Sequence, residues 1–155
     1  MADAVKTYAA IYSLADVTVS LLYTKGGAGV GPYDLSSGGA GRISISDAGD
    51  LASHTTTANG FVVINKLRPK SGTCTLEVPV NSEADKFLRS YISFVKNCQN
   101  EEFASGTLTV YDKMAGRTTT LNNIVPQKDP DEAYDQSSTN RSYQFLYADK
   151  AVTNA

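Results

Sequence analysis

The chain has 155 residues, of which 41% are hydrophobic and 19% charged, and its formal net charge is −2. This length fits one domain with a hydrophobic core of its own, so we expect residues 1–155 to form a single domain. The charge excludes a general basic field that would hold nucleic acid through its phosphates, and two cysteines are too few for a disulfide framework. Abundant Ser, Thr and Gly without any Trp favour a β-rich chain over a helical bundle.

The N-terminal region carries no recognisable targeting signal. Met1–Ala4 lacks the basic segment and apolar stretch of a signal peptide. The most apolar stretch, Tyr8–Tyr23, is interrupted by Asp16 and is too short to cross a bilayer. We therefore expect a soluble protein made in a cytoplasm, with no membrane anchor.

The first half of the chain reads as short strands separated by polar segments. Val17, Val19 and Leu21 alternate with more polar neighbours, which predicts a strand. Glycine clusters over about 24–41 predict a long flexible arm. A short strand over 42–46 and a threonine-rich loop over about 47–59 follow.

The middle of the chain contains the clearest elements. The Asn59-Gly60 turn signal precedes a β-branched run over 61–64. Residues 73–80 alternate, with Cys74, Leu76 and Val78 on one face, and Pro79 belongs near the end of such a strand. Ser82 and Asp85 then form a capping signal for a helix over about 83–97, whose apolar residues recur at helical spacing.

The remaining segments return to strand patterns. Residues 106–112 and 118–125 flank a turn, which predicts a hairpin. A polar, acidic loop over 127–140 leads to a last strand over 142–147. Several strands with one helix and no helix–strand alternation predict a mainly β (α+β) sandwich or barrel with one packed helix.

The order of these motifs resembles the tail tube proteins of contractile-tailed bacteriophages (the myovirus type). The matching segments cover roughly residues 12–148, and their order and spacing carry the resemblance. They are the opening strand at Tyr12–Val17, the Gly-rich stretch with Arg42–Ile45, the Thr57–Gly60 turn before Phe61–Val63, the Lys70–Leu76 strand leading into the helix, and Thr109–Asp112. The departures are an irregular turn at Met114–Arg117, no Trp in the final strand and the unmatched loop at 129–132.

The resemblance implies a structural subunit of the virion, assembled in the host cytoplasm. Its subunits would form hexameric rings, pool their strands into one inner barrel and stack into a tube inside the contractile sheath. The implied partners are further copies of the chain, the tail sheath protein, and baseplate and tail-end proteins. During genome ejection DNA would pass through the lumen without specific binding. A tail terminator or another ring protein of a phage tail or contractile injection system is the alternative.

Two charged groups are candidates for subunit contacts. Lys66, Arg68 and Lys70 alternate along the chain and can point the same way. We expect them at a subunit boundary, facing phosphate or an acidic loop of a neighbour, although such residues often form only a solvated face. The acidic candidates are Asp129, Asp131 and Glu132, which with Asp135 lack the glycine and distal glutamate of a calcium loop.

The two cysteines have two interpretations. Cys74 falls on an apolar strand face and Cys98 falls on the apolar stripe of the helix, one turn after Val95, which predicts two small buried hydrophobic residues. The alternative is that Cys74 and Cys98 form disulfides in the released particle, where the surroundings permit oxidation.

No motif indicates an enzyme, a cofactor or a metal site. The Gly-rich segment at 27–32 fails the dinucleotide-binding spacing. His54, the single histidine, has no nucleophile elbow or zinc pattern near it. A carbohydrate-binding or adhesion domain is a further alternative, but the chain offers no Trp for an aromatic platform and its tyrosines are dispersed.

Overall fold

The computed structural model describes residues 17–35, 41–132 and 139–154. Within them the strands are β1 (Val17–Lys25), β2 (Ala28–Asp34), β3 (Arg42–Asp47), β4 (Ala52–Thr56), β5 (Val62–Lys66), β6 (Gly72–Pro79), β7 (Gly106–Asp112), β8 (Arg117–Pro126), β9 (Asn140–Tyr147) and β10 (Asp149–Asn154). The helices are α1 (Glu83–Asn97) and the single turn α2 (Asn100–Phe103).

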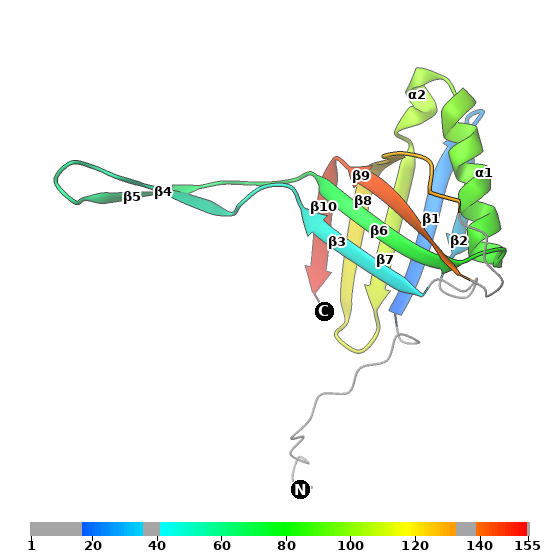
Figure 1. The fold of residues 1–155 in the computed structure, drawn as a ribbon, viewed down its shortest axis with the longest axis horizontal. Helices are drawn as coiled ribbons and strands as arrows, with labels where there is room; N and C mark the ends of the chain where they lie inside the picture. The colour runs from blue at the N-terminus through cyan, green and yellow to red at the C-terminus, as the bar shows by residue number, and fades with distance from the viewer. Residues whose placement is uncertain (1–16, 36–40, 133–138, 155) are drawn as a thin grey trace, which may run out of the picture.

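One antiparallel sheet forms the body of the molecule (Figure 1). Its strand order is β2-β1-β7-β8-β9-β6-β3. Strand β8 changes partners along its length, because it pairs with β7 and β10 over most of its course but with β9 at Val125 and Pro126. The prediction of a mainly β fold with one packed helix is confirmed.

Period-2 alternation builds the core. In β6 the side chains of Cys74, Leu76 and Val78 are fully buried, while the residues between them point away. The β6–β9 register places Cys74 opposite Phe145 and Leu76 opposite Tyr143, so both strands direct large apolar groups to one face. Strand β6 ends at Pro79, where a residue without an N–H costs no ladder bond.

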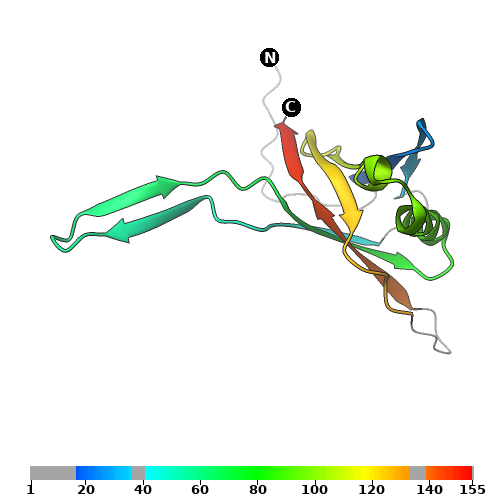
Figure 2. The ribbon, with the colours of Figure 1, turned by 90° about the horizontal axis from the view of Figure 1, so that it is seen from above.

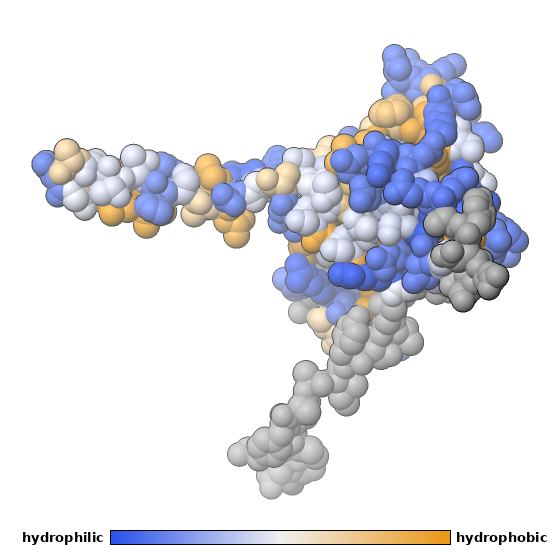
Figure 3. Space-filling model, in the orientation of Figure 1, coloured by the Kyte–Doolittle hydropathy of each residue, from blue (hydrophilic) through white to orange (hydrophobic). Residues whose placement is uncertain are grey.

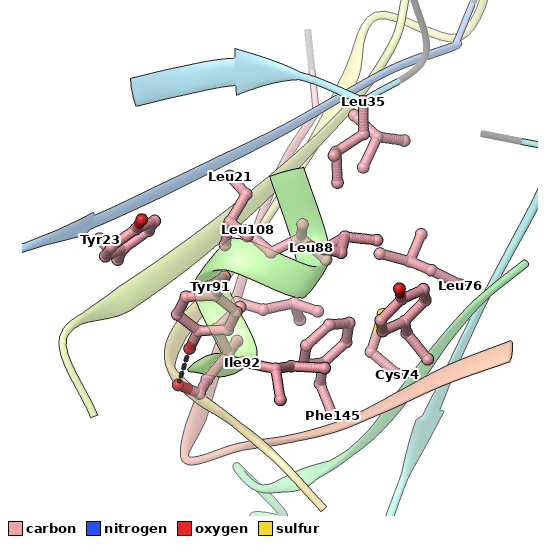
Figure 4. Packing of buried hydrophobic residues seen from close by; sticks show 14 of the residues in the cluster. Leu21, Tyr23, Leu35, Cys74, Leu76, Leu88, Tyr91, Ile92, Leu108 and Phe145 are labelled. Carbon is pink, nitrogen blue, oxygen red and sulfur yellow. Dashed lines mark hydrogen bonds between the residues drawn. The ribbon is translucent and has the colours of Figure 1, made fainter. Parts of the chain in front are cut away.

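Helix α1 packs its apolar stripe onto this core (Figure 4). The Ser82 hydroxyl accepts a hydrogen bond from the Asp85 N–H at 3.2 Å, as the capping signal predicts. The Asp85 carboxylate in turn accepts from the N–H of Asn81, one residue earlier than in a standard capping box. On the buried face, the Tyr91 hydroxyl donates to the Ile124 carbonyl at 3.0 Å, which fixes α1 against β8.

The glycine-rich segment differs from the expected flexible arm. Part of it is strand β2, which pairs with β1 through the two-residue turn Gly26-Gly27. Both glycines have positive φ, at 60° and 82°, which suits the tight hairpin turns that only glycine enters without strain. Residues 36–40, which include part of the second glycine cluster, and the predicted first motif at 12–16 lie outside the described residues.

The expected loop at about 47–59 also differs from the structure. It contains β4, which pairs with β5 in a two-stranded sheet separate from the main one. Two further elements, α2 and β10, occur where no element was predicted.

Candidate functional site: an assembly arm

The hairpin of β4 and β5 projects far from the body of the molecule (Figures 1 and 2). We call residues 48–71 the arm. At its root the Ala48 N–H donates to the Ser71 carbonyl at 3.0 Å, and further out the Leu67 N–H donates to the Leu51 carbonyl at 2.9 Å. At its tip the Thr57 N–H donates to the Phe61 carbonyl at 2.8 Å. The arm is therefore hydrogen-bonded at its root, along β4–β5 and at its tip, and it is not a loose loop.

The arm exposes large apolar side chains to solvent. Those with more than two-fifths of their surface exposed are Leu51, Phe61, Val62, Val63, Ile64 and Leu67, with Ile64 at 75% and Phe61 at 69%. Figure 3 shows hydrophobic residues along the projecting ribbon. An isolated two-stranded hairpin is only marginally stable in water, and a large exposed apolar surface marks an interaction site. The arm is the part of the described chain best suited to contact another molecule.

The basic candidates lie on the arm. Lys66 ends β5, where it pairs with Ala52, and Arg68 and Lys70 follow between β5 and β6. All three residues are exposed. No ion pair joins any of them to another residue in the described ranges, so their charges are available to a second molecule.

The acidic candidates lie on the body, away from the arm. Asp129 forms an ion pair with Lys96 of α1, and Asp131 lies 3.9 Å from Lys128. Glu132 lines the same polar hollow as Asp129, between α1 and β9. Within one subunit the structure therefore does not bring the basic and acidic groups together. The accompanying Asp135 lies outside the described residues.

The two cysteines occupy different environments, and both are free thiols. Cys74 is fully buried, and this burial raises the pKa of its thiol to about 12. Cys98 follows the last residue of α1 and is only partly buried, which differs from the expected burial of both thiols. Its Sγ donates to the Val95 carbonyl at 3.3 Å.

A buried ionic cluster fixes α1 to β9. Arg141 Nη1 lies 3.0 and 2.9 Å from the two carboxylate oxygens of Asp85, and the Tyr143 hydroxyl donates to the same carboxylate at 2.6 Å. Burial opposes ionisation of Asp85, but these hydrogen bonds and the neighbouring guanidinium charges outweigh it and hold the pKa of Asp85 below its usual range. The cluster is structural, and the sequence indicated only the capping role of Asp85.

A second charged cluster stands at the root of the arm. The Asp47 carboxylate accepts a hydrogen bond from the Tyr147 hydroxyl at 2.6 Å and another from Lys150 Nζ at 2.9 Å. Asp47 ends β3, while Tyr147 ends β9 and Lys150 lies in β10. The base of the arm is thus held to the C-terminal strands.

The described residues offer no evident site for chemistry. Among them no group of three His, Cys, Asp or Glu side chains is placed to hold a metal ion. His54 lies on the exposed strand β4, opposite Ile64. No helix within the described ranges is long and apolar enough to span a membrane.

A family model covers most of the chain. A family model described as "Bacteriophage PhiTE tail tube protein" matches residues 9–152. No curated protein matches the chain significantly.

Solved structures with a similar fold come from the anti-feeding prophage, a contractile injection system and a GTA particle. The cap that terminates the tube of the anti-feeding prophage has a TM-score of 0.59 at 12% identity, with 99% of this chain and 97% of that chain covered. The sheath–tube complex of the extracellular contractile injection system PVC has a TM-score of 0.56 at 13% identity, with 92% of this chain and 91% of that chain covered. The tail of an empty GTA particle, computed with helical refinement and C6 symmetry, has a TM-score of 0.57 at 11% identity, with 94% of this chain and 99% of that chain covered.

Proposed function

We propose, from the premise that the chain belongs to the bacteriophage PhiTE tail tube family, that it forms hexameric rings which stack into a tail tube. Members of this family are structural tail proteins rather than enzymes. The sixfold symmetry of the similar GTA tail supports a hexamer. In the proposed tube, neighbouring subunits combine their sheets into one inner barrel, which would remove the exposed strand edges of each monomer.

The arm is the observation that carries this proposal. Its apolar side chains stay exposed in the described subunit, and burying them against further copies would stabilise an assembly by about 25 cal/mol per Å² of apolar surface. A ring-and-stack assembly supplies such copies through heterologous contacts, in which two different surfaces of the same chain meet.

The charged candidates suggest which surfaces of two subunits meet. The arm carries Lys66, Arg68 and Lys70 against Asp50, a net charge of +2, whereas the whole chain carries −2 and the remainder therefore −4. The proposal places the arm of one subunit near acidic residues of another, including Asp129, Asp131 and Glu132. Opposite charges of this kind steer association and select its register.

DNA conduction needs a surface that does not hold phosphate. The face of β7 and β8 turned away from the core carries hydroxyl side chains, namely Thr107, Thr109, Thr118 and Thr120. This face offers no row of cations that would bind DNA by releasing counterions. It is suited to line a channel through which DNA slides during ejection.

The sheath and baseplate are the proposed outer partners. The similar PVC structure is a sheath–tube complex, and a protein of the sixfold-symmetrised anti-feeding prophage baseplate has a TM-score of 0.52 with this chain at 12% identity. The proposed location is the tail of the virion, after assembly in the host cytoplasm.

Negative-stain electron microscopy of the purified full chain tests the proposal. Long tubes of stacked sixfold rings are the expected result. A chain that sediments as a monomer at every concentration up to the millimolar range would exclude tube formation by this protein alone.

The same images distinguish the alternative function. The similar structures include tube-terminating proteins as well as tubes, so the fold does not separate the two roles. Single rings that never stack would identify a terminator, whereas the family match favours the tube itself.

The charged contacts have their own test. Reversing Lys66, Arg68 and Lys70 together to Glu should weaken assembly and change its salt dependence, as measured by sedimentation at several ionic strengths. Reversing Lys113, an exposed residue of the β7–β8 turn, serves as the control. Unchanged assembly and salt response in the triple variant would remove these residues from the interface.

A further inference from the structure

A large groove lies at the end of the body opposite the arm. It has a volume of about 1030 Å³, is open to solvent, and is bordered by the β1–β2 turn, the second half of α1 and the short α2. Phe94 and Cys98 contribute apolar surface, while Lys25, Arg89 and Glu102 contribute charged groups. The groove is open enough to receive a segment of polypeptide.

The walls of this groove are held in place by hydrogen bonds. The Gly27 N–H of the β1–β2 turn donates to a Glu102 carboxylate oxygen at 3.1 Å. The Thr24 N–H donates to the Ser105 hydroxyl at 3.1 Å. The glycine turn, which has open space around both of its Cα atoms, leaves no side chain in the opening. The groove is therefore a formed feature of the free subunit.

The arm tip has the properties of an occupant. Phe61 is 69% exposed, and the hydrogen bonds between Thr57 and Phe61 and between Gly60 and Thr57 hold the turn compact. Residues 57–61 carry no charge, so they can enter a partly apolar groove without the cost of burying an ion. An ordered tip also loses little conformational freedom on binding.

The positions of the tip and the groove favour contact between two copies rather than within one. The arm and α1 stand at opposite ends of the longest axis in both views (Figures 1 and 2). A projection at one end and a recess at the other generate a head-to-tail contact that can repeat from subunit to subunit. The groove is lined by Lys25 and Arg89 against Glu102, so an uncharged tip meets no like-charge repulsion there.

We propose that the arm tip around Phe61 of one subunit docks in the groove between the β1–β2 turn and α1 of a second copy. This inference rests on the proposed self-assembly and names two surfaces that meet in it. It places Phe61 against the region of Phe94 and Cys98 of the neighbour.

The native Cys98 supplies the test. A disulfide requires Cα atoms about 4.4–6.8 Å apart, so it reports docking at close range. Three single variants, A58C, N59C and F61C, place a thiol along the tip. After mild oxidation, at least one of them should give a ladder of dimers and higher oligomers on a non-reducing gel. The buried Cys74 should take no part.

Two controls make the cross-link specific. Adding C98S to the cross-linking variant should abolish the ladder. A thiol at Ser53, which lies in β4 nearer the root of the arm, should not link to Cys98. A ladder that survives C98S, or that S53C forms equally well, would overturn the proposed docking.

The same samples, viewed by electron microscopy, separate this inference from the proposed function. Tubes without a ladder from any of the three variants would overturn the docking but leave the tube function in place. A ladder without tubes would support the docking and overturn the tube function. Neither tubes nor ladder would overturn both.

A second measurement uses substitutions without cross-linking. F61S should raise the concentration needed for assembly about tenfold, in line with the loss of a buried aromatic anchor. M114S removes another exposed apolar side chain, on the β7–β8 turn, and should change the concentration needed for assembly little. S93W, which fills the groove from an exposed position on α1, should act like F61S. Equal behaviour of F61S and M114S would contradict the docking.

Discussion

The arm and the helix-covered body use similar apolar residues in opposite ways. On the body, Leu76, Leu88 and Phe145 are fully buried and belong to one cluster. On the arm, Phe61 and Ile64 face solvent although β4 and β5 are regularly paired. The difference shows that regular hydrogen bonding and burial are separate properties in this chain. The body buries its largest apolar cluster within the single subunit, while the arm leaves its large apolar side chains exposed to a partner.

Removing a member of the buried ionic cluster should have the largest effect on the body. Asp85→Ala leaves the Arg141 guanidinium buried without its counter-charge, and we expect a loss of about 3–5 kcal/mol in the free energy of unfolding. Urea denaturation of the disassembled chain measures this loss. Glu83→Ala, which removes an exposed ion pair with Lys86 on the same helix, should cost less than about 1 kcal/mol. Similar losses in the two variants would contradict the structural role of the cluster.

Truncating apolar residues on the two regions tests the comparison directly. Leu76→Ala opens a cavity in the core and should cost about 2–5 kcal/mol of unfolding free energy. Ile64→Ala on the arm should cost less than about 0.5 kcal/mol in the monomer, because the side chain is already in water. The arm variant should instead weaken assembly, as seen by sedimentation. If Ile64→Ala destabilises the monomer as strongly as Leu76→Ala, the arm is part of the folding unit.

Protonation of Asp85 in acid should lower the free energy of unfolding of the body. The loss should be smaller than that caused by Asp85→Ala. The pKa of Asp85 is lowered in the folded chain, so its contribution to stability is complete above its unfolded pKa of about 3.9 and declines as the pH falls through the folded pKa. Protonation leaves the carboxyl group able to hydrogen-bond, which limits the loss. Chemical denaturation between pH 7 and pH 2 should show a smaller acid dependence for Asp85→Asn than for the wild type. An identical dependence would assign the acid response to other groups.

The smallest effect is expected at the turn beside the groove. Gly26 has φ of +60° with open space around it, so Gly26→Ala costs only the backbone strain, about 1 kcal/mol. Gly29→Ala, at a neighbouring glycine without positive φ and with its nearest atom at 3.7 Å, is the matched control and should be close to neutral. Thermal unfolding of the two variants measures the difference, and equal melting temperatures would argue against a strained turn.

The elements that could be predicted are those whose signals are local. Ser82 and the helical spacing of Leu88, Tyr91 and Val95 identified α1, and the alternation of residues 73–79 identified β6. The ordered motifs also indicated the tail tube family, which the match over residues 9–152 confirms. In these cases the residues that give the signal lie close together in the sequence, so no distant contact is needed to interpret it.

The features that were not predicted either depend on residues distant in the sequence or lack an apolar pattern. Strand β4 has no large apolar residue, and its pairing with β5 depends on the Asn59-Gly60 turn rather than on a buried face. Arg141 is buried because Asp85, 56 positions earlier, receives it. The spacing of Cys98 from Val95 predicts that it continues the apolar stripe of the helix. However, α1 ends at Asn97, so the thiol faces the groove instead of the core. The interface residues named from the sequence stay predictions.

The way in which the arm leaves the sheet determines how it would respond to mechanical load. Its two strands continue into β3 and β6, and β6 is joined to β9 by eight consecutive residue pairs. Strand β6 runs obliquely to the arm (Figure 1), so a pull on the arm has a component along β6 and its ladder with β9. In that direction the ladder is sheared, and its hydrogen bonds resist together instead of opening one after another. The connection is therefore expected to resist load along β6 better than a sideways peel.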